Sequence, residues 1–294
     1  MGILFFLWRL FEFVFFGVVH GFRFLARALR RLIFRSGPGI AECMGLFITE
    51  LFESLGATFV KVGQVMSTRP DVLPEEITGP LTRLQDKVAP FDVARIPGII
   101  RQETGKDLDE LFSEFDRHPV SAASVAHVHK GTLKDGRIVA VKIRRPGLLR
   151  KVKYDLLVLK IFSKFLNLFI PGMHLVALPE MIDEFGAQIY KQLDFQKEAE
   201  NNRRFRENFI GNDEVRIPYL VDELCTDGLL VMEFIEGLLQ VGNHEMSTQE
   251  MQRAALTAAH SFFQMIYGDG FIHADMHPGN VFFLKDGTFV LLDL

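Results

Sequence analysis

The chain has 294 residues, enough for one large domain or for two lobes with their own cores. Hydrophobic residues make up 48% and charged residues 24%, which excludes a disordered chain. The net charge of −4 offers no general attraction for a polyanion, so we expect no nucleic acid among the partners.

Residues 1–36 are rich in phenylalanine and arginine and predict a long helix. Polar residues recur on one helical face at three- and four-residue steps or their multiples, although Phe5, Phe13 and Phe16 interrupt that face. We expect this helix to lie in a membrane interface, with its arginines near anionic head groups. The polar face consists of Arg9, Glu12, His20, Arg23, Arg27, Arg30 and Arg31.

Two other interpretations of this helix stay open. Its apolar face could pack on the rest of the domain or on a second subunit, which leaves a homodimer open. A transmembrane span would place the arginines from Arg23 to Arg35, and the domain that follows them, on the cytoplasmic side. No basic residue precedes the apolar run, so we do not expect a cleaved signal peptide.

Residues 37–118 predict a helical extension. Apolar residues recur at a helical spacing from Met44 to Leu55, and Gly56 ends that helix, although Gly45 lies inside it. Pro74 followed by two acids marks the start of another helix. Further helices are predicted over residues 59–66, 92–104 and 108–115.

Residues 119–237 predict a small strand-rich lobe with inserted helices, and residues 238–294 the start of a mainly helical lobe. Each carries a predicted β-hairpin with a Lys-Asp-Gly turn. Ser247 and Glu250 form a capping-box pattern at the start of a long helix. The predicted hairpin strands are 125–129 with 137–143 and 281–284 with 288–292, a further strand is 229–234, and the helices are 152–169, 179–209 and 247–267.

The stretch from His273 to Asn280, followed by Asp293, is the most specific motif. Phosphoryl transfer from ATP needs a carboxylate that receives the acceptor's proton and oxygen ligands that hold Mg²⁺. Kinase-like folds carry such an Asp and Asn five residues apart on one loop, as Asp275 and Asn280 are, and a hairpin then delivers a second Asp. The alternatives are a polar surface loop or a metal site built on His273 and His277.

Lys142 ends the apolar run Val139-Ala140-Val141 on a predicted buried strand. A lysine in that setting can reach ATP phosphates if an anionic partner holds it. Glu198, on a predicted helix, is the candidate partner. The alternative for Glu198 is a solvated position on the helix surface.

The segment Ser121-Ala122-Ala123-Ser124 stands where a kinase has a glycine-rich loop. It resembles the alanine-rich loop of the UbiB family of atypical kinase-like proteins. Lys61-Val62-Gly63-Gln64 resembles the KxGQ motif of that family. The segments 69–71, 84–86 and 273–280, which follow it along the chain, also resemble that family. The resemblance extends from about Lys61 to Leu294.

This resemblance implies an α+β, protein-kinase-like fold with two lobes and an N-terminal helical extension. It also implies ATP and Mg²⁺ as cofactors, and ATPase behaviour rather than protein kinase activity. The implied role is support of ubiquinone biosynthesis, with a membrane lipid or quinone precursor and quinone-biosynthesis enzymes as partners. The implied location is the cytoplasmic side of a bacterial inner membrane, or the mitochondrial or plastid equivalent.

The resemblance also assigns roles to individual residues. Lys142 would contact the ATP phosphates and pair with Glu198, and Asp275 would be the catalytic-loop acid. Asn280 and Asp293 would hold Mg²⁺. Lys61 and Gln64 would regulate the site, Ser121, Ala122, Ala123 and Ser124 would cover the phosphates, and Glu233, Phe234 and Ile235 would meet the adenine.

This sequence departs from the family pattern at three places. Gln192 stands where the family usually has Glu, and Met276 replaces a usual proline. The sequence stops just after Asp293, so we expect an incomplete large lobe and a fragment, split product or degraded copy of reduced stability.

Two rival functions follow from the same residues. Gln192 and the early stop favour a catalytically silent lipid-binding or scaffold protein that keeps the kinase shape. An antibiotic- or choline-type phosphotransferase shares the His-x-Asp loop, but Lys61 to Gln64 and the alanine-rich loop argue against it.

Overall fold

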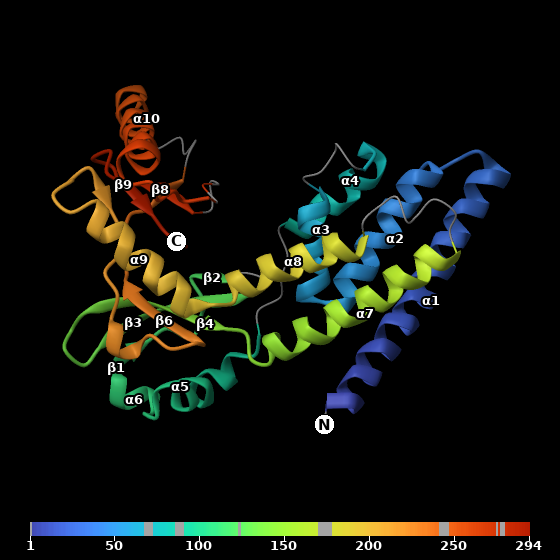
Figure 1. The fold of residues 1–294 in the computed structure, drawn as a ribbon, viewed down its shortest axis with the longest axis horizontal. Helices are drawn as coiled ribbons and strands as arrows, with labels where there is room; N and C mark the ends of the chain where they lie inside the picture. The colour runs from blue at the N-terminus through green and yellow to red at the C-terminus, as the bar shows by residue number, and fades with distance from the viewer. Residues whose placement is uncertain are drawn as a thin grey trace. The chain divides into compact units, whose positions relative to one another are not determined.

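The computed structural model describes residues 2–67, 73–85, 91–122, 125–169, 178–240, 247–274, 276 and 280–294. It is a mixed helix-and-sheet fold with a long N-terminal helix, as predicted (Figure 1). The chain divides into a helical unit, residues 1–91, 122–126 and 145–193, and a sheet unit, residues 92–121, 127–144 and 194–294. The predicted limits at residues 37, 119 and 238 remain predictions.

Helices build the helical unit around an apolar core. Helix α2 ends at Gly56, whose φ of 91° suits glycine, and α3 starts at the next residue. Phe52, Leu55 and Phe59 are buried where these two helices meet α4. The helices are α1 (Gly2–Phe34), α2 (Ile40–Leu55), α3 (Ala57–Ser67), α4 (Glu75–Leu81), α7 (Leu148–Phe169) and α8 (Leu178–Gln192), with a 3-10 turn η1 (Thr82–Gln85).

Gly45, which weakened the helix prediction from the sequence, lies where α2 crosses α4. A Cβ atom added at Gly45 would come within 2.8 Å of the Glu76 carbonyl oxygen and 3.0 Å of the Ile77 Cα. Both neighbours are backbone atoms, which cannot turn aside as a side chain can. The close approach of two helices therefore explains a glycine inside α2.

We therefore expect Gly45→Ala to lower the free energy of unfolding by about 1–3 kcal/mol, because α2 and α4 must separate. Gly98→Ala is the control: Gly98 is exposed in helix α5 (Ile96–Thr104), and an added Cβ would meet nothing beyond its chain neighbours within 4 Å. Alanine should be neutral or stabilising there. Chemical denaturation of both variants measures the difference, and equal stabilities would refute this account of Gly45.

Helix α1 packs on α2 and α7 (Figure 1). Arg9 is buried, and its Nε donates to Asp155 Oδ1 at 2.6 Å while Nη2 donates to the Leu55 carbonyl at 3.0 Å. Glu12 also accepts a hydrogen bond from Arg9. The charge of Arg9 is thus neutralised inside the helical unit.

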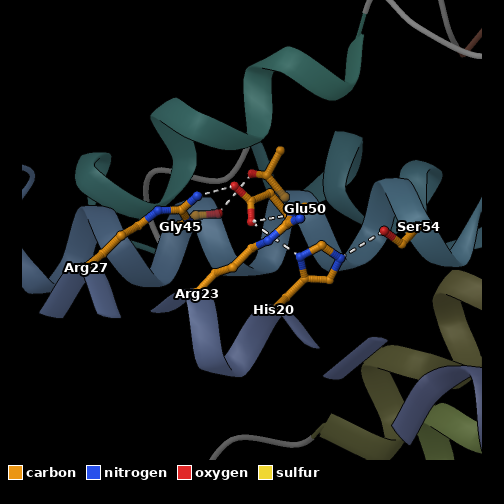
Figure 2. A network of polar contacts seen from close by, with 7 residues as sticks. His20, Arg23, Arg27, Gly45, Glu50 and Ser54 are labelled. Atoms are coloured by element: carbon orange, nitrogen blue, oxygen red, sulfur yellow. Dashed lines mark hydrogen bonds and ion pairs between the residues drawn. The ribbon is translucent and has the colours of Figure 1, made fainter. Parts of the chain in front are cut away.

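A second polar cluster lies further along α1 (Figure 2). Glu50 of α2 accepts from Arg27 Nη2 at 2.5 Å and lies 3.3 Å from His20 Nδ1, while His20 Nε2 lies 2.9 Å from Ser54 Oγ. Burial alone would raise the pKa of Glu50, but Arg27 and His20 outweigh it and the pKa is lowered. Glu50 therefore stays ionised and holds α1 on α2.

One expectation for this helix, and one alternative left open by the sequence, need correction. Arg9 and Arg27 do not reach toward head groups, because Asp155 and Glu50 bind them within the helical unit. Most apolar residues of α1 do not pack on the domain; Phe13 and Phe16 do, beside the core of α2 and α3. The predicted polar face is the face of α1 that packs on the other helices, which explains why it contains these two phenylalanines.

The sheet unit contains an antiparallel sheet with strand order β1-β3-β4-β6. The predicted helix over 108–115 is only half correct, because it ends at Leu111 and Phe112–Phe115 pairs with β3. Gly131 of β3 leaves room for the Phe112 ring, since a Cβ there would lie 2.9 Å from it. The elements are η2 (Val93–Arg95), α5 (Ile96–Thr104), α6 (Leu108–Leu111), β1 (Phe112–Phe115), β2 (Ser121–Ala122), β3 (Ala126–Leu133), β4 (Ile138–Arg144), η4 (Asp222–Leu224) and β6 (Leu229–Glu233).

A second sheet of the same unit has strand order β5-β9-β8-β7 and contains the predicted C-terminal hairpin. Phe205, Met265 and Phe289 are buried in the core between this sheet and its helices. The Ser247–Glu250 capping box is present, as predicted. The elements are α9 (Phe195–Asn208), β5 (Val215–Arg216), β7 (Leu239–Gln240), α10 (Thr248–Phe263), the π-helix η5 (Gln264–Gly268), β8 (Val281–Phe283) and β9 (Phe289–Leu291).

The predicted helix over 179–209 is wrong in its middle. Helix α8 ends at Gln192. Asp194 then caps a new helix by accepting a hydrogen bond from the Lys197 N–H at 3.0 Å. An aspartate at such a position competes with helical backbone and favours a start over a continuation. The break makes Glu198 part of the first turn of α9.

Candidate active site

Lys142 is a buried charge in the middle of the first sheet. It lies on β4 opposite Leu230 of β6, between the buried Val141 and Ile143. Its Nζ donates to both carboxylate oxygens of Glu198, at 2.8 Å and 3.0 Å, and to Asp293 Oδ1 at 2.5 Å. A buried ammonium needs such partners, because desolvation without them is costly.

The two carboxylates come from elements remote in the sequence. Glu198 projects from the first turn of α9, which the Asp194 cap starts. Asp293 follows β9 and has a φ of 53°, a left-handed conformation that few residues other than glycine adopt. The pair predicted between Lys142 and Glu198 is therefore present, with Asp293 as a second partner of Lys142.

Charge coupling sets the ionisation of this cluster. Burial alone would lower the pKa of Lys142, but the carboxylates of Glu198 and Asp293 outweigh it and raise the pKa. Burial raises the pKa of Glu198. The Asp293 side chain is half exposed; desolvation would raise its pKa, but the Lys142 ammonium outweighs that effect and the pKa is lowered. With all three groups ionised, two carboxylates face one ammonium, so the cluster attracts a further cation.

Asn280 lies at the same end of the C-terminal hairpin as Asp293. Strands β8 and β9 pair with Val281 opposite Leu291, and the Leu292 N–H donates to the Asn280 carbonyl at 3.0 Å. An amide and a carboxylate are hard oxygen ligands of the kind that Mg²⁺ prefers. Among the described residues no group of three or more His, Cys, Asp and Glu side chains could hold a metal.

The remaining predicted site residues are only partly described. Asp275, Ala123 and Ser124 lie outside the described residues, and so does His277 of the alternative metal site. Ser121 and Ala122 form the exposed strand β2. His273, the other residue of that alternative, is buried, and its Nε2 lies 3.5 Å from the Leu292 carbonyl.

The predicted adenine-binding segment follows β6. Glu233 ends that strand and forms an ion pair with Arg216, which the sequence analysis did not single out. The Phe234 N–H donates to the Ile138 carbonyl at 3.2 Å, and Ile235 is buried. A backbone hydrogen bond therefore holds this segment at Ile138, the first residue of β4.

Lys61 and Gln64 lie in α3 of the helical unit. The Gln64 side-chain amide donates to the Leu84 carbonyl at 2.8 Å. Gly63 between them fits tightly, because a Cβ there would lie 2.2 Å from Leu84 Cδ1. Both residues of the KxGQ motif after Val62 therefore pack against the segment that carries Leu84.

Phe195 is a site residue that the sequence analysis missed. It is fully buried, and Lys142 Nζ lies 5.4 Å from its ring centroid. The signal was its spacing, three residues before Glu198, which puts both side chains on one face of a helix. The ring shields the ion pair from water and strengthens it.

Comparisons with known proteins found a matching family and a similar solved structure. The model of the ABC1 atypical kinase-like domain matches residues 83–294. Among solved structures, Rv3197 from Mycobacterium tuberculosis, in a complex with erythromycin, is similar with 29% sequence identity and a TM-score of 0.59. The similarity covers 83% of this chain and 62% of that one, so the chain spans less than two thirds of its relative.

The lowered pKa of Asp293 predicts a pH-dependent stability. The ionised carboxylate stabilises the fold above its unfolded pKa of about 3.9, and this stabilisation is lost as the pH falls through the lower folded pKa. Asp293→Asn should therefore lower the free energy of unfolding at neutral pH, with a difference from wild type that shrinks in acid. Urea denaturation across this pH range measures it.

Asp213→Asn is the control for that experiment, because Asp213 is exposed in a turn. It should have little effect at any pH. A stability difference for Asp293→Asn that stays constant from neutral pH to below pH ~3 would contradict the assignment of this carboxylate as a stabilising partner of Lys142.

Proposed function

Because this chain belongs to the family of ABC1 atypical kinase-like domains, we propose that it is a kinase-like ATPase or phosphotransferase that binds ATP with Mg²⁺. Its activity supports ubiquinone biosynthesis at a membrane, with the domain on the cytoplasmic side. The substrates are membrane lipids or quinone precursors, and the partners are quinone-biosynthesis enzymes. The resemblance of the KxGQ motif and the alanine-rich loop to the UbiB family supports this finer assignment.

One observation carries the proposal: buried Lys142 is held between Glu198 and Asp293, which lie 56 and 151 positions away in the sequence. In kinase-like proteins a strand lysine paired with a helix glutamate contacts the nucleotide phosphates. Lys142 and Glu198 have that relation, and the second partner of Lys142 is a carboxylate suited to a metal ion. An ion pair that only stabilises the protein surface would not need a lysine as buried as Lys142.

The residues divide the work as follows. Lys142 would neutralise phosphate charge, and Glu198 would fix the direction of its ammonium. Asn280 and Asp293 would hold Mg²⁺, which neutralises the charge that develops on the phosphates. Asp275 would take the proton of the acceptor. Ser121 to Ser124 would cover the phosphates, and Glu233 to Ile235 would meet the adenine.

Nucleotide binding tests the proposal directly. We expect the chain to bind a fluorescent ATP analogue only with Mg²⁺, and Lys142→Met to weaken binding about tenfold or more, because the ammonium that faces the phosphates is lost. Lys134→Met is the matched control, since Lys134 is exposed in the turn after β3. Lys142→Arg keeps the positive charge. If this variant is folded and still binds the nucleotide more weakly, the loss of binding is not caused by unfolding. Absence of Mg²⁺-dependent binding in the wild type would refute the proposal.

Measuring ATP turnover distinguishes the enzyme from the second candidate, a silent scaffold, which Gln192 favours because it replaces the family's usual Glu. For the enzyme, we expect Asp275→Asn to abolish ATP hydrolysis measured with lipid vesicles and to leave nucleotide binding within about twofold, because the carboxylate acts on the acceptor's proton. Pull-down of quinone-biosynthesis enzymes should survive that change in either case. Hydrolysis that is absent from the wild type under all conditions would favour the scaffold.

A further inference from the structure

Two polar side chains of helix α1 are buried, while many of its large apolar side chains are exposed. Arg9 and His20 are each 5% exposed, although both are polar. The opposite face carries large apolar side chains at the spacing of a helical stripe, with exposures from 46% at Leu29 to 74% at Leu4. This stripe, called the outer face below, includes Leu4, Leu7, Phe11, Val18, Phe22 and Leu29.

Charged contacts fix which face of α1 points outward. Arg9 is bound to Asp155 of α7, and Arg27 is bound to Glu50 of α2. Turning the outer face inward would strand these charges, and breaking a buried ion pair costs more than the pair contributes. The outer face is therefore a fixed property of the helical unit.

The outer face is too large to stay in contact with water. Helix α1 has 33 residues, which corresponds to a length of about 50 Å. A soluble monomer rarely leaves an apolar patch of more than a few hundred Å² uncovered. Within the described residues, α1 is also the helix long and apolar enough to cross a membrane.

The charge at the end of α1 indicates what covers this face. Arg30, Arg31 and Arg35 are exposed there, next to the exposed Leu32 to Phe34. Apolar side chains that end in a basic cluster match a lipid surface with anionic head groups. A second copy packed in parallel would bring the same arginines together, which is unfavourable.

We propose that α1 lies in the plane of an anionic lipid surface, with its outer face toward the acyl chains and its polar face on α2 and α7. It does not span the bilayer while the helical unit is folded. A span would carry Arg9 and His20 through hydrocarbon and separate them from Asp155 and Ser54. This inference is independent of nucleotide binding, so either can fail alone.

Trp8 provides the readout, because it is the one tryptophan of the chain and is 58% exposed on α1. The full chain is reconstituted with vesicles of phosphatidylcholine, with or without phosphatidylglycerol, that carry brominated acyl chains. A second probe is Val18→Trp in a Trp8→Phe background, near the middle of α1. If the helix lies in the plane, bromines near the head groups quench both probes best, at a depth of about 5–10 Å.

The variants and outcomes decide the case. Phe11→Glu with Phe22→Glu should reduce the vesicle-bound fraction about tenfold or more, whereas Ile210→Glu, at an even more exposed apolar residue of the sheet unit, should not. Phosphatidylglycerol should raise binding and salt should lower it. Quenching of the Val18→Trp probe best by bromines at the chain ends means a span and overturns the proposal. So does a dimer in lipid-free buffer that dissociates on the Phe11 and Phe22 changes without any vesicle binding.

Discussion

The sheet unit depends on the ion pairs that the buried ammonium of Lys142 forms with two carboxylates. Removing a charge from water costs on the order of several kcal/mol, and ion pairs with Glu198 and Asp293 offset that cost. These ion pairs join β4, the start of α9 and the end of the C-terminal hairpin. A second carboxylate beyond what one ammonium needs leaves room for a metal ion. The contact that organises the fold and the contact that would bind Mg²⁺ are thus one cluster.

Much of this cluster could be predicted from local signals. The apolar run before Lys142, the five-residue spacing of Asp275 and Asn280, and the hairpin before Asp293 each have a short-range cause, and the strands that carry Lys142 and precede Asp293 are present. The failures were also local. Four residues from Phe112 are too few to distinguish a strand from a helix by periodicity. The role of Phe195 depends on which face of α9 meets β4, and this is a tertiary fact.

Helix α1 shows a different limit of sequence reasoning. Periodicity divides a helix into a polar and an apolar face, but it does not say which face meets the protein. The answer depends on Glu50 and Asp155, whose positions in α2 and α7 supply anions for the arginines of α1. Only the assembled helices reveal that the phenylalanines on the polar face, Phe13 and Phe16, mark the packed side.

The same arrangement has a consequence for anyone who shortens this protein to improve its solubility. Deleting the apolar helix α1 would remove Arg9 and Arg27 from Asp155 and Glu50. Asp155 is buried and Glu50 is partly buried. The shortened protein would lose an exposed apolar surface but would keep two carboxylates without their arginine partners. Replacing the exposed leucines and phenylalanines of α1 by polar residues would improve solubility and keep the arginine ion pairs.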